Sequence, residues 1–533
     1  MNKIKVPTNF YPVIFAIIPI LSLYLRNTQF VQFSDFLFLV FIPLLTLIPL
    51  WLILIKLTGS INKSALISTV FFLLFFSFGS FLEVISDLLT RVGIDIRVQL
   101  LNNIGWKLNL QLIIWIIVFV LFAIFILRLK SDLKLITTFM NVTSLVLLLL
   151  TFFKYSTNIQ TVLASNRSDQ PTNEISSSFA ERSLAHNPLP YDELPNIYFI
   201  ILDGYGRSDT LHDFYKYDND GFEDFLERKG FYLADRSRSN YLHTSLSIAS
   251  NLNYSYLQDY AEQMKTIPEG DAQIINLIQN NRVMGFLATQ GYKIISFESG
   301  YFATELNHID SYYSNTWTFS QFTNSVINLT PLQIWLDKFQ YDNHRNRIHY
   351  TFSKIPDVDE QNQPVFVFAH IIAPHPPFVF GANGEPLDRE KVFTLNENLM
   401  VEITNEIEYA TKYPDQINYI NSLVMKMIEQ IRAKSDRGSI IVIQGDHGPR
   451  LRLDGNNLEN TKLEEVFPIF NAIYFFDQDY SSLSNDITSV NTFRVIFDQY
   501  FGTDLGLLEN RSFYSKISTP YQFVDVTDSF PDR

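Results

Sequence analysis

The chain of 533 residues contains no cysteine. This absence excludes disulfide bonds, a thiolate metal site, a cysteine nucleophile and an iron–sulfur cluster. Charged residues are also scarce, at 18% of the chain, and there is no run of Lys or Arg that could release counterions from a nucleic acid. The hydrophobic share of 47% is too high for a purely soluble protein, so the composition predicts a membrane portion.

The charge is unevenly distributed along the chain. The formal net charge is −14, yet residues 1–154 hold 12 Lys and Arg against 5 Asp and Glu, and the remainder holds 29 against 50. The chain therefore joins two parts of different character. The acidic second part also argues against a nucleic-acid partner, because binding a polyanion needs clustered cations.

Five long uncharged runs in the first part each approach the ~20 residues that cross a bilayer. They are Phe10–Leu25, Phe36–Ile55, Ala65–Leu82, Leu108–Leu127 and Leu135–Phe153. None contains Asp, Glu, Lys, Arg or His, so an ion pump would lack its usual ionisable groups. The fifth run carries several Thr, Ser and Asn residues, which we expect to face other helices.

The distribution of Lys and Arg in the short flanks predicts the orientation. Seven such residues lie on the amino-terminal side of the spans and four on the other side. This bias favours a cytoplasmic N-terminus. We therefore expect a multi-pass protein of the cell (inner) membrane, with everything after Lys154 outside the cytoplasm.

The second part begins with a polar segment, residues 155–194, that is typical of a linker. Apolar runs and helical stretches then alternate over residues 195–533, which predicts one α/β domain with a mainly parallel sheet. The apolar runs are Asn196–Leu202, Tyr292–Phe297, Val365–Ala369, Ser439–Ile443 and Phe470–Phe476. Helical stretches include Gly221–Lys229, Ile274–Gln290 and Glu402–Lys434.

Polar side chains of particular types follow three of these apolar runs. The segments are 203–207 (DGYGR), 370–378 (HIIAPHPPF) and 445–450 (GDHGPR), and a Ser/Thr-rich helix start surrounds Thr244. In a parallel sheet the chemistry collects beyond the carboxyl ends of the strands. We therefore expect these segments to lie close together.

Two carboxylates (Asp203, Asp446), an imidazole (His447) and a hydroxyl (Thr244) make a suitable site for a hard cation. A threonine hydroxyl is a weak nucleophile, and a dication on its oxygen would stabilise the alkoxide. A helix start at Thr244 would also suit a phosphate on that oxygen. Each residue alone has a structural alternative, such as a turn former, a helix cap or a loop histidine. Their co-occurrence after three strands favours the metal site.

The order of these motifs resembles a known family. LDGYG, a Thr in T-x-x-S, H-x-x-x-x-H-P-P-F and GDHG together resemble the sulfatase-like branch of the alkaline phosphatase superfamily. Five spans followed by an exterior domain are similar to lipoteichoic acid synthases and lipid A phosphoethanolamine transferases. The resemblance implies a five-helix transmembrane domain (residues 1–154), a linker (155–194) and an extracytoplasmic sulfatase-like catalytic domain (195–533).

The resemblance also implies roles for particular residues. It implies one divalent metal ion, Mn²⁺, Mg²⁺ or Zn²⁺, bound by Asp203, Asp446 and His447, with Thr244 as both ligand and nucleophile. Residues assigned to substrate binding are His375, His370, Ser247, Arg450 and Arg238. For the arginines, which could clamp a phosphate, the alternative is ordinary salt bridging.

Two absences narrow the activity that the resemblance implies. The sequence after Thr244 lacks the C/S-x-P-x-R context that sulfatases need, and no histidine follows His447 to complete a second metal site. We therefore predict a metal-dependent transferase that moves phosphoglycerol or phosphoethanolamine from a membrane phospholipid donor to an envelope glycan or lipid acceptor, through a phosphothreonine. The alternatives are a phosphoesterase or sulfatase-like hydrolase with the same site, and an inactive envelope binding or scaffold protein.

Overall fold

The computed structural model describes residues 9–28, 31, 33–91, 104–131, 133–156, 189–264, 271–306, 308–315, 321–358, 363–387, 393, 395, 406–434 and 437–530. The chain forms two compact units. The membrane unit comprises Met1–Pro171, Thr318–Phe339 and Arg389–Val392, and the sheet unit comprises Thr172–Trp317, Gln340–Asp388 and Phe393–Arg533. Most of the linker predicted over residues 155–194 lies outside the described residues.

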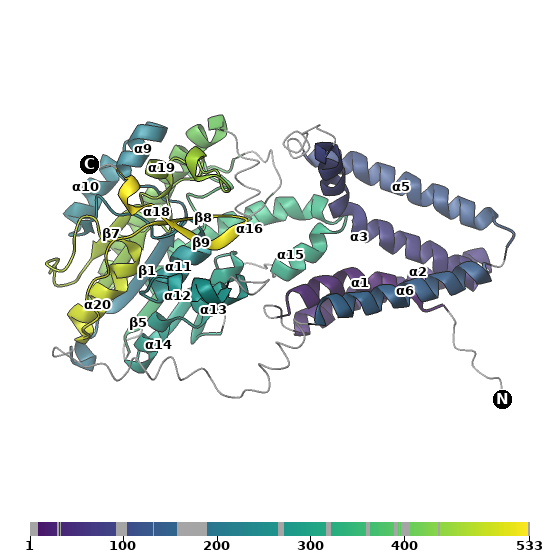
Figure 1. Cartoon of the computed structure of the whole chain (residues 1–533), viewed down its shortest axis with the longest axis horizontal. Coiled ribbons are helices and arrows are strands. Elements are labelled where there is room, and N and C mark those ends of the chain that lie inside the picture. The colour runs from purple at the N-terminus through teal and green to yellow at the C-terminus, as the bar shows by residue number, and fades with distance from the viewer. Residues whose placement is uncertain are drawn as a thin grey trace. The chain divides into compact units, whose positions relative to one another are not determined.

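The membrane unit is built from apolar helices (Figure 1). They are α1 (Tyr11–Arg26), α2 (Phe33–Thr58), α3 (Ile61–Arg91), α5 (Ile104–Arg128) and α6 (Lys134–Lys154). Four of them, α2, α3, α5 and α6, are long and apolar enough to cross a membrane, and α1 is shorter, at 16 residues. The predicted apolar helices are therefore present, four long and one shorter.

Several polar residues of α6 lie on its packed side, as expected, whereas Thr138 is exposed. Thr137 and Ser144, seven positions apart, are buried, and Asn141 between them accepts a hydrogen bond of 3.2 Å from the backbone N–H of Tyr11. The opposite side of α6 is apolar and exposed, as Leu135 and Phe139 show. Polar groups against neighbouring helices and apolar groups outward form the pattern expected of a helix in lipid.

The sheet unit contains a seven-stranded sheet with strand order β2-β7-β6-β1-β5-β3-β4. Its strands are β1 (Asn196–Leu202), β2 (Tyr232–Leu233), β3 (Lys293–Phe297), β4 (Ser311–Tyr313), β5 (Val365–Ile371), β6 (Ser439–Gln444) and β7 (Asn471–Tyr474). Strands β6, β1, β5, β3 and β4 run parallel, whereas β7 is antiparallel to β6 and β2 is antiparallel to β7. The predicted fold class, α/β with a mainly parallel sheet, is confirmed.

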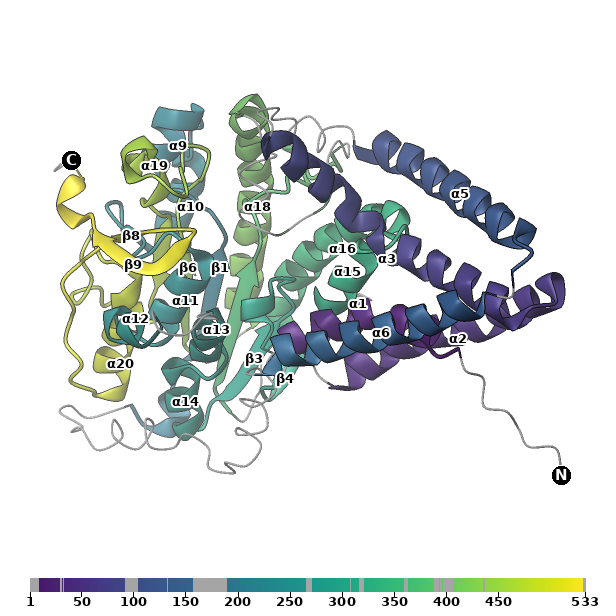
Figure 2. The ribbon, with the colours of Figure 1, turned by 45° about the vertical axis from the view of Figure 1, so that its right-hand side comes forward.

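Helices cover both faces of this sheet (Figure 2). In β1, Tyr198, Ile200 and Leu202 belong to a core cluster with α18 (Glu406–Lys434). Phe199 points to the other face, where its ring lies 5.0 Å from that of Phe493 in α20 (Thr492–Phe501). Because side chains alternate along a strand, a strand buried on both faces has a continuous apolar run, as β1 has.

The remaining elements of the chain are shorter. The other described helices are α9 (Ser208–Tyr215), α10 (Asp220–Arg228), α11 (Thr244–Leu252), α12 (Gln258–Met264), α13 (Asp271–Gln279), α14 (Arg282–Thr289), α15 (Gln321–Asn328), α16 (Gln333–Lys354) and α19 (Leu463–Val466). A second, two-stranded sheet pairs β8 (Phe513–Lys516) with β9 (Thr519–Asp525).

Candidate active site

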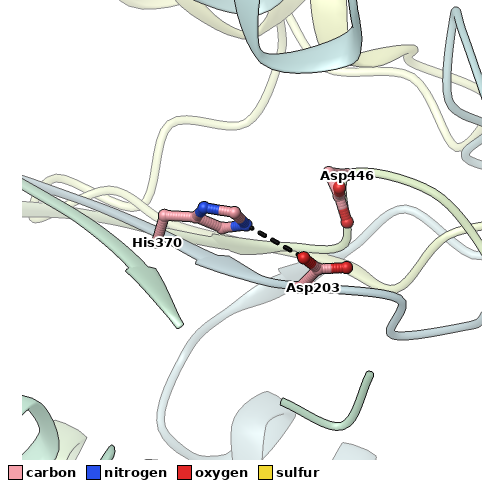
Figure 3. A group of neighbouring side chains, drawn as sticks. All are labelled: Asp203, His370 and Asp446. Atoms are coloured by element: carbon pink, nitrogen blue, oxygen red, sulfur yellow. Dashed lines mark ion pairs between the residues drawn. The ribbon is translucent and has the colours of Figure 1, made fainter. Parts of the chain in front are cut away.

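Three adjacent strands bring the predicted site residues together. Strand β1 lies between β6 and β5, and all three run parallel. Asp203 directly follows β1, Asp446 follows β6 after one glycine, and His370 lies near the end of β5. Figure 3 shows Asp203, His370 and Asp446 gathered at this edge of the sheet. The side chains meet because the carboxyl ends of parallel strands share one edge.

The four residues predicted as metal ligands form one buried cluster. Nε2 of His447 lies 3.1 Å from Oγ1 of Thr244 and 3.4 Å from Oδ1 of Asp203. The same nitrogen lies 3.3 Å from Oδ2 of Asp446. All four residues are at most 4% exposed. Atoms of these types at these separations can surround a single cation.

The hydrogen bonding of His447 fixes which ring nitrogen can act as a ligand. Its Nδ1 lies 2.7 Å from the carbonyl oxygen of Gly448, which can only accept. The proton of the neutral imidazole therefore sits on Nδ1, and Nε2 presents its lone pair to the cluster.

His370 lies on the other side of Asp203. Its Nε2 is 3.3 Å from Oδ2 of Asp203, and its Nδ1 is 2.9 Å from Oγ1 of Thr304. One ligand atom each from Asp203, His370 and Asp446 lies within 4.8 Å of the others, which makes the three a buried group able to hold a metal ion. The sequence assigned His370 to substrate binding, whereas the structure places it beside the carboxylates.

The electrostatics of the two carboxyl groups also favour a cation. Burial would raise the pKa of Asp203, but the nearby His375, His370 and His447 outweigh burial and hold this pKa well below its usual range. Burial and the charge of Asp203 raise the pKa of Asp446. Two buried carboxylates this close repel one another unless a positive charge lies between them.

Three ligand atoms in this cluster are buried and make no hydrogen bond to the described residues. They are Oδ1 of Asp203, Oδ2 of Asp446 and Nε2 of His370. Buried polar atoms normally have partners, and leaving one unpaired costs about 1–3 kcal/mol. A divalent cation would satisfy all three, so the residues present fit a metal ion.

Backbone contacts hold the carboxylates in place. Gly204, whose φ is +69°, donates its N–H to Oδ1 of Asp446 over 3.0 Å. The backbone N–H of His375 donates to the carbonyl of Asp203 over 2.9 Å. Ser247 donates its hydroxyl to the carbonyl of Asp446 over 2.7 Å, so this predicted substrate-binding residue also supports the loop that carries a ligand.

The remaining predicted substrate residues differ in their surroundings. The ring of His375 lies 6.0 Å from that of His447, between centroids, beside the cluster. Arg450 is buried and donates to the carbonyl of Leu242, just before Thr244. Arg238 stacks on Phe530 at 4.3 Å, and among the described residues no hydrogen bond or ion pair joins it to the cluster.

Two residues of α18 that the sequence analysis did not single out support the site. The hydroxyl of Tyr413 donates to the carbonyl of Gly204 over 2.6 Å and accepts from the N–H of Gly206 over 3.1 Å. The side-chain amide of Gln416 donates to the carbonyls of Pro374 and His375. A signal existed for Gln416, since an amide on an otherwise apolar helix face has to find buried partners.

One protein family matches this chain. The sequence profile of the Sulfatase family matches residues 195–468, which is more than half of the chain. This range includes all four predicted metal ligands, Asp203, Thr244, Asp446 and His447, and the whole of β1, β5 and β6. No match to a curated protein was found.

Solved structures with a similar arrangement have low sequence identity. The lipooligosaccharide phosphoethanolamine transferase A from Neisseria meningitidis, an integral membrane protein, is 13% identical, with 92% of this chain and 93% of that chain covered and a TM-score of 0.38. The periplasmic domain of EcEptC from Escherichia coli is 12% identical, covers 66% of this chain and 96% of its own, and gives a TM-score of 0.42. The lipoteichoic acid synthase LtaP from Listeria monocytogenes is 12% identical, with 64% and 83% covered and a TM-score of 0.37.

The family profile confirms the resemblance on which the sequence analysis relied. Its match spans the strand ends that carry Asp203, Asp446 and His447, as well as the helix that begins at Thr244. With more than half of its residues matched by that profile, the chain belongs to the sulfatase family of the alkaline phosphatase superfamily, as an enzyme with apolar helices preceding its catalytic domain.

Proposed function

We propose that this protein transfers a phospho-alcohol group, phosphoglycerol or phosphoethanolamine, from a membrane phospholipid to a hydroxyl of an envelope glycan or lipid. The observation that carries this proposal is the position of Thr244 at the first residue of α11, with Oγ1 3.1 Å from His447. The chain has no cysteine, and Leu246 and Ile248 stand where the C/S-x-P-x-R context has Pro and Arg. A phosphorus centre is therefore a better target than a sulfate ester.

We assign one divalent cation to Asp203, Asp446, His447 and Thr244, with His370 facing the second oxygen of Asp203. The buried ligand atoms that lack a hydrogen bond and the close pair of buried carboxylates support this assignment. Bound there, the cation would stabilise negative charge on the threonine oxygen. Oxygen-rich ligation suits Mg²⁺ and Mn²⁺, and the imidazoles suit Zn²⁺.

The transfer has two displacements at the same phosphorus. In the first, the hydroxyl of Thr244 loses its proton and its oxygen forms a bond to the phosphorus of the lipid. The bond to the diacylglycerol oxygen breaks, and that oxygen leaves with the electron pair and takes up a proton. In the second, the hydroxyl oxygen of the acceptor bonds to the phosphorus and loses its proton. The oxygen of Thr244 then leaves and regains a proton.

The residues around Thr244 suit these steps. Backbone N–H groups in the first turn of a helix lack intrahelical acceptors, so the start of α11 offers donors to phosphate oxygens. His375, beside the cluster, is the group that we assign to the phosphate and to protonation of the leaving oxygen. Arg450 fixes the residues before Thr244 through its bond to Leu242.

The apolar helices support a lipid as the donor. A chain with four long apolar helices and one shorter one is held at a bilayer, where phospholipid is abundant. The Lys and Arg bias supports a catalytic domain outside the cytoplasm, the side on which envelope glycans and lipids are modified.

The test uses the full chain in phospholipid vesicles, with label either in the head group or in the acyl chains and with octyl glucoside as a soluble hydroxyl acceptor. A transferase releases labelled diacylglycerol and moves head-group label to the glucoside. A hydrolase releases free phospho-alcohol at the same rate without acceptor, and a scaffold protein releases neither product. Thr244→Ala should abolish release, whereas the neighbouring Ser245→Ala should not.

A further inference from the structure

A segment that lies between two strands of the sheet in sequence belongs to the membrane unit. Residues 318–339 separate β4 from β5 along the chain, yet they cluster with the apolar helices. The described part contains α15 (Gln321–Asn328) and the first turns of α16 (Gln333–Lys354). Both ribbon views show α15 beside the helices of the membrane unit (Figures 1 and 2).

One face of α15 is buried against the membrane helices. Phe322 and Val326, one helical turn apart, are each 6% exposed and share a core cluster with residues of α1, α2 and α3. The ring of Phe322 meets that of Tyr24 at a centroid distance of 6.3 Å. Side chains at i and i+4 lie on the same face of a helix, so this contact fixes the orientation of α15.

The backbone also approaches α3 closely. The N–H of Gly79 donates to the carbonyl of Leu329 over 3.1 Å. A Cβ at position 79 would lie 1.7 Å from the carbonyl oxygen of Asn328, so only glycine permits this approach. The segment is therefore docked on the membrane helices by a specific contact.

The contacts place the segment at one end of the helical bundle. Tyr24 lies near the end of α1, Phe36 near the start of α2, and Gly79 near the end of the apolar part of α3. Successive helices run in opposite directions, so these three positions fall at the same end, which is also where α6 ends at Lys154. Because the ends of membrane-spanning helices lie near the bilayer surface, we assign this end of the bundle to that level.

Large apolar side chains are exposed just after this docked helix. Leu332, in the turn just before α16, is 50% exposed, and Trp335, in its first turn, is 64% exposed. The N–H of Trp335 donates to the carbonyl of Leu332 over 3.1 Å, so the two residues are neighbours across one turn. Phe33, at the start of α2 and at the same end of the bundle, is 59% exposed and contacts Tyr24. Trp and other aromatic residues gather at the interface between water and lipid.

We propose that residues 332–339 form an interfacial anchor, in which Leu332 and Trp335 insert into the phospholipid leaflet at the end of the bundle where α6 ends. Continuity with the membrane helices favours lipid as the occupant of this face. Apolar groups at this level of a bilayer leave water by entering the boundary of the acyl chains. A second copy of the chain is the competing occupant. The proposal does not depend on the transferase chemistry.

The absence of cysteine makes a direct test possible, since each introduced thiol is the only one in the chain. Spin labels are placed on Leu332→Cys and, separately, Trp335→Cys in the full chain in phospholipid vesicles. Leu121→Cys in α5, 62% exposed, is the control for the bilayer interior. Leu507→Cys in the sheet unit, 55% exposed, is the control for water.

Collision with oxygen, which concentrates in lipid, is compared with collision with a water-soluble nickel complex. We expect labels at 332 and 335 to favour oxygen, at a depth between those of the two controls. The same nickel accessibility at 332 and 335 as at 507 would overturn the proposal. Protection from both reagents, with broadening between labels of two chains, would assign the face to a second copy and would also overturn it.

Discussion

Oγ1 of Thr244 and Nε2 of His447 lie 3.1 Å apart, although the two residues are 203 positions apart in sequence. The start of α11 supplies the first, and the loop that follows β6 supplies the second. This contact joins the proposed nucleophile to a histidine whose lone pair points at the carboxylates.

Asp446→Asn should abolish metal binding without unfolding the protein. Asparagine keeps an oxygen that can accept from the N–H of Gly204, and it removes the repulsion from Asp203. Wild-type protein should gain about 2.7 kcal/mol of stability at a metal concentration 100-fold above Kd. The measurement is the thermal midpoint with chelator and with added Mn²⁺ or Zn²⁺.

The matched control for Asp446→Asn is Asp209→Asn, at an exposed carboxylate paired with Arg207. This variant should keep the wild-type rise in midpoint with metal. A rise of the same size in Asp446→Asn would contradict the assignment of Asp446 as a ligand.

His370→Gln should lower metal affinity about 10- to 100-fold, the effect of losing a group that holds or supports a ligand. Thr304→Val should have a smaller effect in the same direction, because it removes the hydroxyl that contacts Nδ1 of His370, Ser299 and the carbonyl of Tyr301 but leaves the imidazole itself in place. Competition with a chelator measures the Kd for the metal. Unchanged affinity in His370→Gln would return this histidine to the substrate role that the sequence suggested.

Glu465 should make stability depend on pH. Burial raises its pKa from the ordinary value of 4.5 to about 7 in the folded protein, although Tyr215 and Arg452 partly oppose the shift. A raised carboxyl pKa means that the folded state holds the proton more tightly. The contribution of this proton to the free energy of unfolding is therefore full below pH 4.5 and is lost as the pH rises to about 7. The loss amounts to about 3 kcal/mol.

The variant Glu465→Gln should remove this dependence. The stability of Glu465→Gln relative to that of wild type should therefore be higher at pH 8 than at pH 5. A destabilisation by the substitution that is the same at both pH values does not affect this comparison. Thermal midpoints of the two proteins in detergent across this range make the comparison. Parallel curves would show that Glu465 does not titrate there.

Gly79→Ala should loosen the docking of α15 on α3. The added methyl group would overlap the carbonyl oxygen of Asn328, so we expect a loss of about 1–3 kcal/mol and faster amide exchange over residues 321–330. Gly285→Ala in α14 is the control, since a Cβ there meets nothing within 4 Å. That control should be neutral or stabilising. Equal exchange in both variants would contradict the close contact.

The strands that carry the site could be predicted because their sequence pattern is simple. The run Asn196–Leu202 matches β1 residue for residue, since a strand buried on both faces needs apolar side chains throughout. The direction of β7 could not be predicted, because an apolar run reads the same in a parallel and an antiparallel strand.

Other differences have local causes. The helix predicted over Ile274–Gln290 is two helices, α13 and α14, because the side chain of Asn281 caps the second by accepting from the N–H of Met284. The position of His370 beside the carboxylates could not be predicted from the sequence. It depends on the face of β5 that His370 occupies and on its contact with Thr304, which is far away in sequence. The docking of α15 on α1 could not be predicted either. The sequence shows that one face of this short helix is apolar, but it does not show which helix that face contacts.

The central claim is that Thr244 carries the phospho-alcohol group, and the mass of that residue tests it most directly. Full-length protein in vesicles is given phospholipid without acceptor, quenched in acid and digested. Mass spectrometry of the peptide around Thr244 should show the added phospho-alcohol on this threonine in wild type and in Ser247→Ala. It should be absent in Thr244→Ala. The modification on Ser245 or Ser247, or full transfer by Thr244→Ala, would contradict the mechanism.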